Sequence, residues 1–360
     1  MDNQEKYYLE FEKPICELEE KIRSLKIASS GNSSREDSSR DSAGTSSSAD
    51  NNSDGIASEI KTLEESCARL KNQIYGQLTP WQRVLLARHP QRPYFLDYLP
   101  LVFEKFVELA GDRAFADDKA IVAGLASLDG TPCAVIGHQK GRTLEEKIAR
   151  SYGMANPEGY RKALRVMRLA EKFSLPVFTF IDTPGAYPGV GAEERGQAEA
   201  IARNLREMAS LQTPIISVII GEGGSGGALG IGVADRILIM ENAYYSVISP
   251  EGCSAILFKD AARAPEAAAS LKITASDLKD LGIADEIIPE PLGGADKNPV
   301  ESASSIKEAL KKNLRLLAGI PGHKLPDLRY KKYRAIGKFK KSRSAAVGSA
   351  RRKRSSPSDG

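Results

Sequence analysis

The chain has 360 residues, 41% hydrophobic and 27% charged, so it is long enough to bury a large core in one or two domains. Its apolar runs are shorter than the about 20 residues that a membrane-spanning helix needs. Residues 1–6 are polar, which argues against a targeting segment, and we expect no membrane association and a cytoplasmic location. The net charge of +4 is uneven, because residues 329–360 hold twelve Lys and Arg but one acid.

The cysteines are few and widely spaced. Cys16, Cys67, Cys133 and Cys253 form no Cys-x-x-Cys pair. This spacing predicts no disulfide framework and no metal site in this chain, and it favours free thiols, mostly buried.

Residues 1–80 are predicted to form a helical hairpin. Apolar residues recur at helical spacing in residues 5–27 and again in residues 56–75. The stretch between them, residues 29–55, is rich in Ser, Asn and Asp and has almost nothing to bury, so we expect a disordered insertion.

Residues 81–325 are predicted to form an α/β domain. Asp129-Gly130 separates two apolar runs and is typical of a hairpin turn. The runs at 177–181 and 214–220 are typical of strands buried on both faces. In chain order we expect a helix at 99–109, strands at 120–125 and 132–137, a helix at 158–173, a strand at 177–181, a helix at 192–210, and strands at 214–220, 236–240 and 245–249. Residues 326–360 are predicted to be a basic, disordered tail.

Two glycine-rich segments, residues 182–191 and 221–230, directly follow the two buried strands. Open α/β sheets bind ligands at the carboxyl ends of their strands, so both segments are candidates for a site. Backbone N–H groups at such a corner attract negative charge, either a phosphate or an oxyanion that develops during a reaction.

Three chemistries use a glycine corner of this kind. The spacing of residues 221–230 matches neither a dinucleotide fingerprint nor a phosphate-binding loop, because no Lys follows Gly227. Gly223-Gly224-Ser225-Gly226-Gly227 does match the Gly-x-Ser-x-Gly elbow of serine hydrolases. The partner histidine should follow the serine, and the one candidate is His323, so we disfavour Ser225 as a nucleophile. The third interpretation is an oxyanion hole made of backbone amides, for which glycine allows close approach.

Several longer motifs carry a specific resemblance. The chain resembles the α subunit of bacterial acetyl-CoA carboxylase carboxyltransferase over residues 5–27 and 56–330. The similarity is carried by residues 137–142, Ile181 to Gly189, Ala192 to Gln197, Gly221 to Gly227 and Val247 to Cys253. It implies a crotonase-like (ClpP/crotonase) spiral of ββα units that follows the N-terminal hairpin.

The resemblance also implies an activity: transfer of the carboxyl group from carboxybiotin, on a biotin carrier protein, to acetyl-CoA, giving malonyl-CoA for fatty acid synthesis. The implied partners are a β subunit, in an α2β2 heterotetramer whose zinc is on the β subunit, and biotin carboxylase in the full complex. Carried over by motif, the amides of Gly226 and Gly227 hold the ureido oxygen of biotin. The substrate-binding residues are expected to be Gly185, Ala186, Tyr187, Gly189, Gly223, Gly224 and Ser225.

Other charged residues admit two interpretations each. Six basic residues are expected for the most part to form a solvated helix face or, less favoured, to contact CoA phosphates or an acidic partner: Lys140, Arg142, Arg161, Lys162, Arg165 and Arg168. Asp182 is expected to make an Asx turn or to orient its own loop. The basic tail could bind nucleic acid, which would be a non-enzymatic alternative function, or serve only solubility; we favour the second because aromatic residues are sparse there.

Overall fold

The computed structural model describes residues 7–33 and 49–337. At its centre lies an eight-stranded sheet in the order β1-β2-β3-β4-β5-β6-β8, with β7 paired to the end of β5. The pairs β1–β2 and β2–β3 are antiparallel, and the pairs from β3 onward are parallel. The strands are β1 (Glu104–Glu108), β2 (Ile121–Leu128), β3 (Thr131–His138), β4 (Val177–Thr183), β5 (Ile215–Gly224), β6 (Arg236–Met240), β7 (Tyr244–Ser246) and β8 (Glu286–Ile288).

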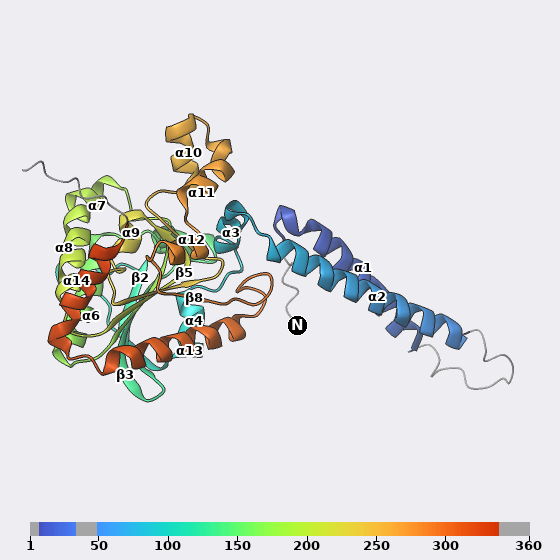
Figure 1. The fold of residues 1–360 in the computed structure, drawn as a ribbon, viewed down its shortest axis with the longest axis horizontal. Coiled ribbons are helices and arrows are strands. Elements are labelled where there is room, and N and C mark those ends of the chain that lie inside the picture. The colour runs from blue at the N-terminus through green and yellow to red at the C-terminus, as the bar shows by residue number, and fades with distance from the viewer. Residues whose placement is uncertain (1–6, 34–48, 338–360) are drawn as a thin grey trace, which may run out of the picture.

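Helices surround this sheet. α6 packs against α8 and against β2 and β3, while α13 packs against α4, β5 and β8 (Figure 1). The α-helices of the described residues are α1 (Lys13–Ser33), α2 (Ala49–Gly76), α3 (Pro80–Ala87), α4 (Phe95–Val102), α5 (Leu144–Ala149), α6 (Pro157–Lys172), α7 (Val190–Glu194), α8 (Gln197–Ser210), α9 (Ser225–Leu229), α10 (Pro250–Phe258), α11 (Ala264–Leu271), α12 (Ala275–Asp280), α13 (Pro299–Ala318) and α14 (Leu325–Ala335).

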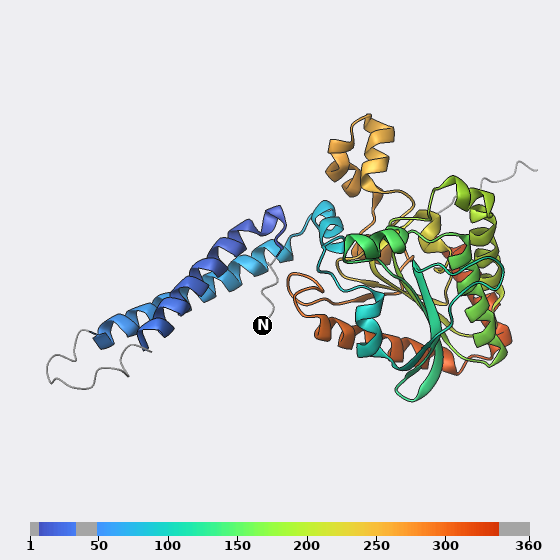
Figure 2. The same ribbon diagram turned by 180° about the vertical axis from the view of Figure 1, so that it is seen from behind.

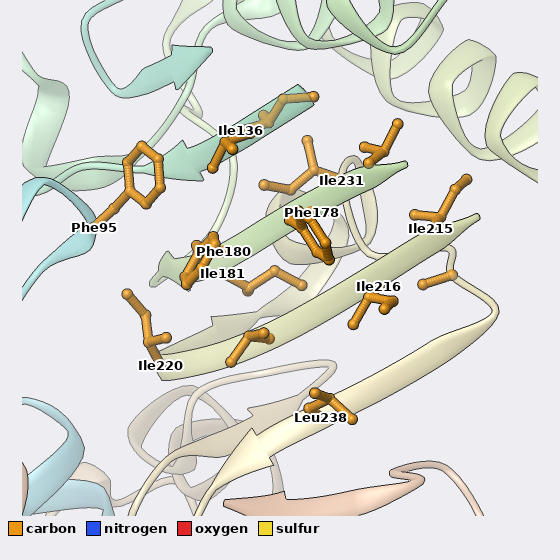
Figure 3. Close-up of a cluster of buried hydrophobic side chains, with 14 of the residues drawn as sticks. Phe95, Ile136, Phe178, Phe180, Ile181, Ile215, Ile216, Ile220, Ile231 and Leu238 are labelled. Carbon is orange, nitrogen blue, oxygen red and sulfur yellow. The ribbon is translucent and has the colours of Figure 1, made fainter. Parts of the chain in front are cut away.

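The core is centred on β4 and β5, both of which are buried along their whole length. Large side chains such as Phe178, Phe180 and Ile216 fill the space beside them (Figure 3). The hydroxyls of Thr179 and Ser217 lie in the same layer and hydrogen-bond to each other at 2.6 Å, so neither is left unsatisfied. The two strands predicted to be buried on both faces are thus confirmed.

The β2–β3 hairpin is also confirmed. Its turn residues, Asp129 and Gly130, both have positive φ, at 47° and 81°. Two left-handed residues match the right-handed twist of the flanking strands, which is why Asp-Gly is favoured at this turn.

The N-terminal helical hairpin extends away from the body (Figures 1 and 2). Ion pairs join its two helices, Lys71 to Glu19 and Lys26 to Glu64, each at 2.6 Å. Both helices are longer than predicted and continue into the range expected to be disordered, because a helix propagates more easily than it nucleates. The rest of that expected insertion, residues 34–48, lies outside the described residues.

Two predicted helices are corrected. Residues 104–108 form strand β1 instead of the end of a helix, because pairing with β2 outweighs a helical spacing of apolar residues. The predicted helix 192–210 is two helices, α7 and α8, since Gly196 between them is left-handed with φ +83°.

The predicted boundary of the basic tail is wrong. Residues 325–335 form helix α14, and Arg329 within it is 1% exposed. Its guanidinium binds both carboxylate oxygens of Asp235, at 2.8 and 3.0 Å, and the carbonyls of Met208, Leu211 and Thr213. Arg329, which lies in the segment predicted to be a tail, is therefore part of the core. Residues 338–360 lie outside the described residues.

Candidate active site

The glycine stretch 221–230 begins as a strand. β5 runs through Ile220 to Gly224, and α9 starts at Ser225. The turn expected directly after Ile220 thus comes four residues later, because Glu222, Gly223 and Gly224 pair with β7.

Glycine is required in this stretch for close packing. A Cβ on Gly224 would lie 2.1 Å from the carbonyl oxygen of Pro184, and one on Gly227 would lie 2.3 Å from the carbonyl carbon of Gly185. Neither glycine has a positive φ. The two predicted glycine segments therefore contact each other backbone to backbone, which no larger residue at these positions allows.

The second segment is held in a fixed turn. Thr183 donates its hydroxyl hydrogen to the Gly185 carbonyl at 2.7 Å and accepts the Gly185 N–H at 3.1 Å. The Tyr187 N–H donates to the Ala155 carbonyl, and Gln197 donates to the Tyr187 carbonyl. Gly185 and Ala186 are half-buried, Tyr187 is exposed, and Gly189 packs against the Tyr187 ring.

Ser225 and Gly226 lie at the surface of this corner. Ser225 is exposed and left-handed with φ +51°, an unfavourable backbone conformation for a residue with a side chain. Gly226 is half-buried, and a Cβ there would meet nothing closer than Ile201 at 3.8 Å. Gly223, by contrast, faces the Tyr245 ring from inside. The N–H groups of Gly226 and Gly227 are in the first turn of α9, where a helix offers them no acceptor.

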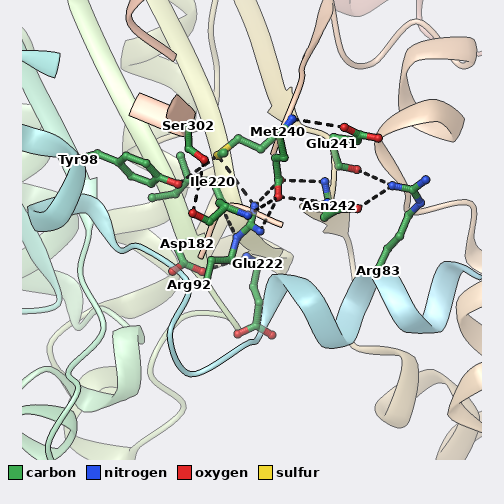
Figure 4. A network of polar contacts seen from close by, with 12 residues as sticks. Arg83, Arg92, Tyr98, Asp182, Ile220, Glu222, Met240, Glu241, Asn242 and Ser302 are labelled. Atoms are coloured by element: carbon green, nitrogen blue, oxygen red, sulfur yellow. Dashed lines mark hydrogen bonds and ion pairs between the residues drawn. The ribbon is translucent and has the colours of Figure 1, made fainter. Parts of the chain in front are cut away.

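A buried ionic cluster lies behind the corner. The Lys140 ammonium binds Asp182 at 2.7 Å and Glu222 at 2.6 Å. Glu222 also binds Arg88 at 2.6 Å and accepts the Tyr244 hydroxyl hydrogen at 2.7 Å. Asp182 is 2% exposed and accepts the Glu222 N–H at 2.9 Å, so it orients the opposite strand instead of its own loop (Figure 4). The predicted Asx turn is therefore wrong.

Burial and charge act in opposite directions on the two carboxylates. Burial would raise the pKa of Glu222, but the cations of Lys140 and Arg88 outweigh it and lower the pKa to about 2. Burial raises the pKa of Asp182 above its ordinary value although Lys140 lies beside it. Glu222 is thus the firmly ionised member of the pair.

The other basic residues considered for CoA are engaged within the chain. Lys162 is fully buried and binds Asp117 at 2.6 Å and the Asp118 carbonyl at 2.7 Å. The remaining ones bind carboxylates or carbonyls nearby: Arg142 to Asp97, Arg161 to Asp112, Arg165 to the Leu109 carbonyl and Arg168 to Glu207. The expectation of a solvated helix face is therefore wrong for Lys140 and Lys162.

Several residues behind the corner were not predicted: Arg88, Arg92, Glu222, Tyr244 and Glu290. Glu222 carries a signal that could have found it, because a carboxylate inside a glycine run needs a buried partner. Arg88 and Arg92 lie close to Pro90 and Pro93, in a stretch whose position in the fold the sequence pattern does not indicate.

No hydrogen bond among the described residues joins Ser225 to a histidine. His138 is fully buried, and its two ring nitrogens make no hydrogen bond to the described residues, although the carbonyls of Phe180 and Gly227 are near. Burial lowers its pKa to about 3, so the ring is neutral at pH 7. This arrangement does not support a serine hydrolase.

Comparison with known proteins identifies the family. The chain matches the family model described as acetyl co-enzyme A carboxylase carboxyltransferase-like over residues 8–337. The chain belongs to that family. It is 54% identical over 335 residues to the acetyl-coenzyme A carboxylase carboxyl transferase subunit alpha of Burkholderia multivorans, covering 93% of this chain and 98% of that protein. The Bordetella pertussis protein of the same name is 53% identical over 336 residues, with the same coverage. The family expected from the motifs is confirmed.

The carboxyltransferase fold is supported by a solved structure. The transcarboxylase 12S crystal structure superposes with a TM-score of 0.52 at 17% identity; the match covers 65% of this chain and 44% of that chain. At that identity the similarity concerns the fold alone, and it confirms the crotonase-like class.

Within residues 7–33 and 49–337, no helix is long and apolar enough to cross a membrane, and no His, Cys, Asp and Glu side chains cluster in a way that could hold a metal.

Proposed function

We propose that this chain is the α half of an acetyl-CoA carboxylase carboxyltransferase in the cytoplasm, and that the amides of Gly226 and Gly227 form its oxyanion hole. The observation that carries the proposal is the backbone contact between the two glycine segments. It fixes Gly224 and Gly227 against residues 184–186 and leaves Ser225 and Gly226 at the surface. Donors held in place in this way stabilise an oxyanion without reorganising during the reaction.

Bound carboxybiotin would supply the carboxyl group that acetyl-CoA accepts. The residues of this chain would hold the ureido oxygen through the two amides. They would flank it with Gly185, Ala186, Tyr187 and Gly189 on one side and with Ser225 on the other, while the buried Gly223 and Gly224 would support the turn from inside. Gly226 is half-buried, and a Cβ there would meet nothing closer than Ile201 at 3.8 Å, which suits a ligand that approaches the main chain closely.

A β subunit would complete the active site, in an α2β2 assembly that receives biotin from a carrier protein and works with biotin carboxylase. Exposed apolar side chains support a partner surface: Val190 is 72% exposed, Val247 77% and Ile256 71%. They lie on or next to α7, β7 and α10. Zinc, if the assembly holds it, would be on the β subunit.

The test is reconstitution. The chain is co-expressed with a carboxyltransferase β subunit, and the purified complex is assayed for carboxylation of free biotin that depends on malonyl-CoA, the reverse reaction. We expect activity from the complex and none from the chain alone. A folded complex without this activity would overturn the proposal.

Ser225→Ala separates this proposal from a serine nucleophile. The oxyanion role uses amides only, so the variant complex should keep carboxyl transfer within a few-fold, whereas the activity would be lost entirely if Ser225 were a nucleophile.

Removing residues 338–360 tests the nucleic-acid alternative, since carboxyl transfer should survive. The deletion must begin after α14, because Arg329 and Lys332 bind Asp235 and Asp285 in the body.

A further inference from the structure

The strand that delivers the candidate oxyanion hole is interrupted by a bulge. β4 and β5 pair regularly up to Ile181 and Ile219, and the next pair is Thr183 with Gly223. Asp182 alone therefore faces residues 220–222 of β5. Ile220 and Gly221 are absent from the registers of β5 with β4, β6 and β7 alike. Backbone groups at a bulge lose their ladder partners, and buried ones need replacements.

Two buried side chains from other elements supply these replacements. The Arg92 Nε–H donates to the Ile220 carbonyl at 2.8 Å, and an Asp182 carboxylate oxygen accepts the Glu222 N–H at 2.9 Å. The side chain of Arg92 is 1% exposed and that of Asp182 is 2% exposed. Figure 4 shows both beside Ile220 and Glu222. Each end of the bulge is thus held by one side chain, the Ile220 end by Arg92 and the Glu222 end by Asp182.

Each of the two side chains is itself fixed by a charged partner. Arg92 binds both carboxylate oxygens of Glu290, at 2.6 and 2.9 Å, and Glu290 accepts the N–H groups of Asn242 and Ala295. Asp182 binds Lys140 at 2.7 Å. A Cβ on Gly221 would lie 2.5 Å from the Asp182 carboxylate, so the bulge has no room to move toward it.

We infer that Asp182 and Arg92 are positioning residues for carboxyl transfer, because they set the place at which β5 delivers the amides of Gly226 and Gly227. The inference rests on the proposed function. Only Gly223, Gly224 and Ser225 separate the bulge from Gly226, and Gly224 is already in backbone contact with Pro184. Three residues leave the chain little slack, so a shift of the bulge pulls Gly224 out of this contact and displaces the amides of Gly226 and Gly227 with it. Misplacement by about 1 Å costs on the order of 100-fold in rate.

The other end of β5 offers a matched control. Asp235 is also a buried carboxylate that binds a cation, Arg329, and it accepts the Ile215 N–H at 2.8 Å. There β5 pairs regularly, since Ile215 is in register with Val177. Both carboxylates stabilise the same strand, but only Asp182 lies at the bulge before the glycine corner.

The experiment uses the full chain in complex with its β subunit and measures kcat and KM for malonyl-CoA in the biotin carboxylation assay. For Asp182→Ala we expect kcat to fall about 100-fold with KM changed less than about threefold. Asp182→Asn keeps an oxygen that accepts the Glu222 N–H, so it should restore kcat to within about tenfold of the wild type. Asp235→Ala should keep kcat within about threefold while lowering the melting temperature.

If Asp182→Ala does not assemble, Arg92→Lys tests the bulge from its other side, because it keeps a charge beside Glu290 and removes the Nε–H. We expect at least a tenfold loss of kcat. Wild-type kcat in assembled Asp182→Ala or Arg92→Lys, or equal losses of kcat in Asp182→Ala and Asp235→Ala, would overturn the inference. Those results require an active wild-type complex, whereas an inactive wild-type complex would overturn the proposed function itself.

Discussion

The two ends of β5 show how one strand can be anchored for stability and for a site. At its start, the Asp235 carboxylate accepts an N–H of the strand and binds Arg329, which uses all five of its N–H groups. At its far end, Asp182 and Glu222 share Lys140, and the ladder is broken by a bulge. The first end is regular and the second is irregular. Local departures from regular structure concentrate at functional sites.

The difference teaches that a buried ion pair is not by itself a sign of a site. Both ends contain carboxylates that are nearly inaccessible to solvent. What distinguishes the far end is the bulge: there Asp182 accepts the Glu222 N–H beside Ile220 and Gly221, which are in register with no neighbouring strand. Breaking each end in turn should therefore give different phenotypes.

The largest expected effect is at the start of the strand. Arg329→Met leaves Asp235 buried without a cation, which typically costs about 3–5 kcal/mol of unfolding free energy. Arg334→Met, on the exposed part of the same helix, is the control and should change stability by less than about 0.5 kcal/mol. Denaturant unfolding of the full chain measures both. Equal values for the two variants would show that α14 does not anchor β5.

The next effect is a pH dependence of the unfolding free energy, which we expect from Glu222 at the far end of β5. The pKa of Glu222 is lowered from 4.5 to about 2 in the folded chain. The unfolded chain therefore takes up this proton first as the pH falls, so the stabilisation is complete above pH 4.5 and is lost toward pH 2. The change amounts to about 3 kcal/mol. Glu222→Gln cannot titrate, and its stability should fall less steeply over this range; parallel curves would contradict the prediction.

Much of the fold could be predicted from local patterns. The segments that form β4 and β5 are apolar and β-branched, and Asp129-Gly130 favours a two-residue hairpin turn. The local sequence is therefore enough to predict these elements. Residues 104–108 could not be assigned in this way. Phe103, Phe106 and Val107 have helical spacing, and only the pairing with β2 makes the segment a strand.

The backbone of the candidate site could be predicted from the sequence, but the buried side chains that hold this backbone in place could not. Glycine runs after two buried strands indicate two loops at one edge of a sheet, and the structure places them in contact. The bulge depends on Arg92 and Asp182, which lie 128 and 40 residues away in sequence from the groups they bind. Arg329 was counted with the basic tail for the same reason: a charged residue reveals its partner only in the folded chain.

The smallest expected effect separates the two adjacent glycines of the corner. A Cβ at Gly227 would lie 2.5 Å from the Ala186 nitrogen, backbone that cannot turn away, so Gly227→Ala should cost about 1–3 kcal/mol of unfolding free energy. A Cβ at Gly226 would make only ordinary van der Waals contact with Ile201 at 3.8 Å, and φ there is not positive, so Gly226→Ala should be neutral or stabilise the chain by about 0.4–1 kcal/mol. Thermal unfolding of both variants measures the difference. If Gly227→Ala is as stable as Gly226→Ala, the two glycine segments are not in contact, and the far end of β5 is no more constrained than its start.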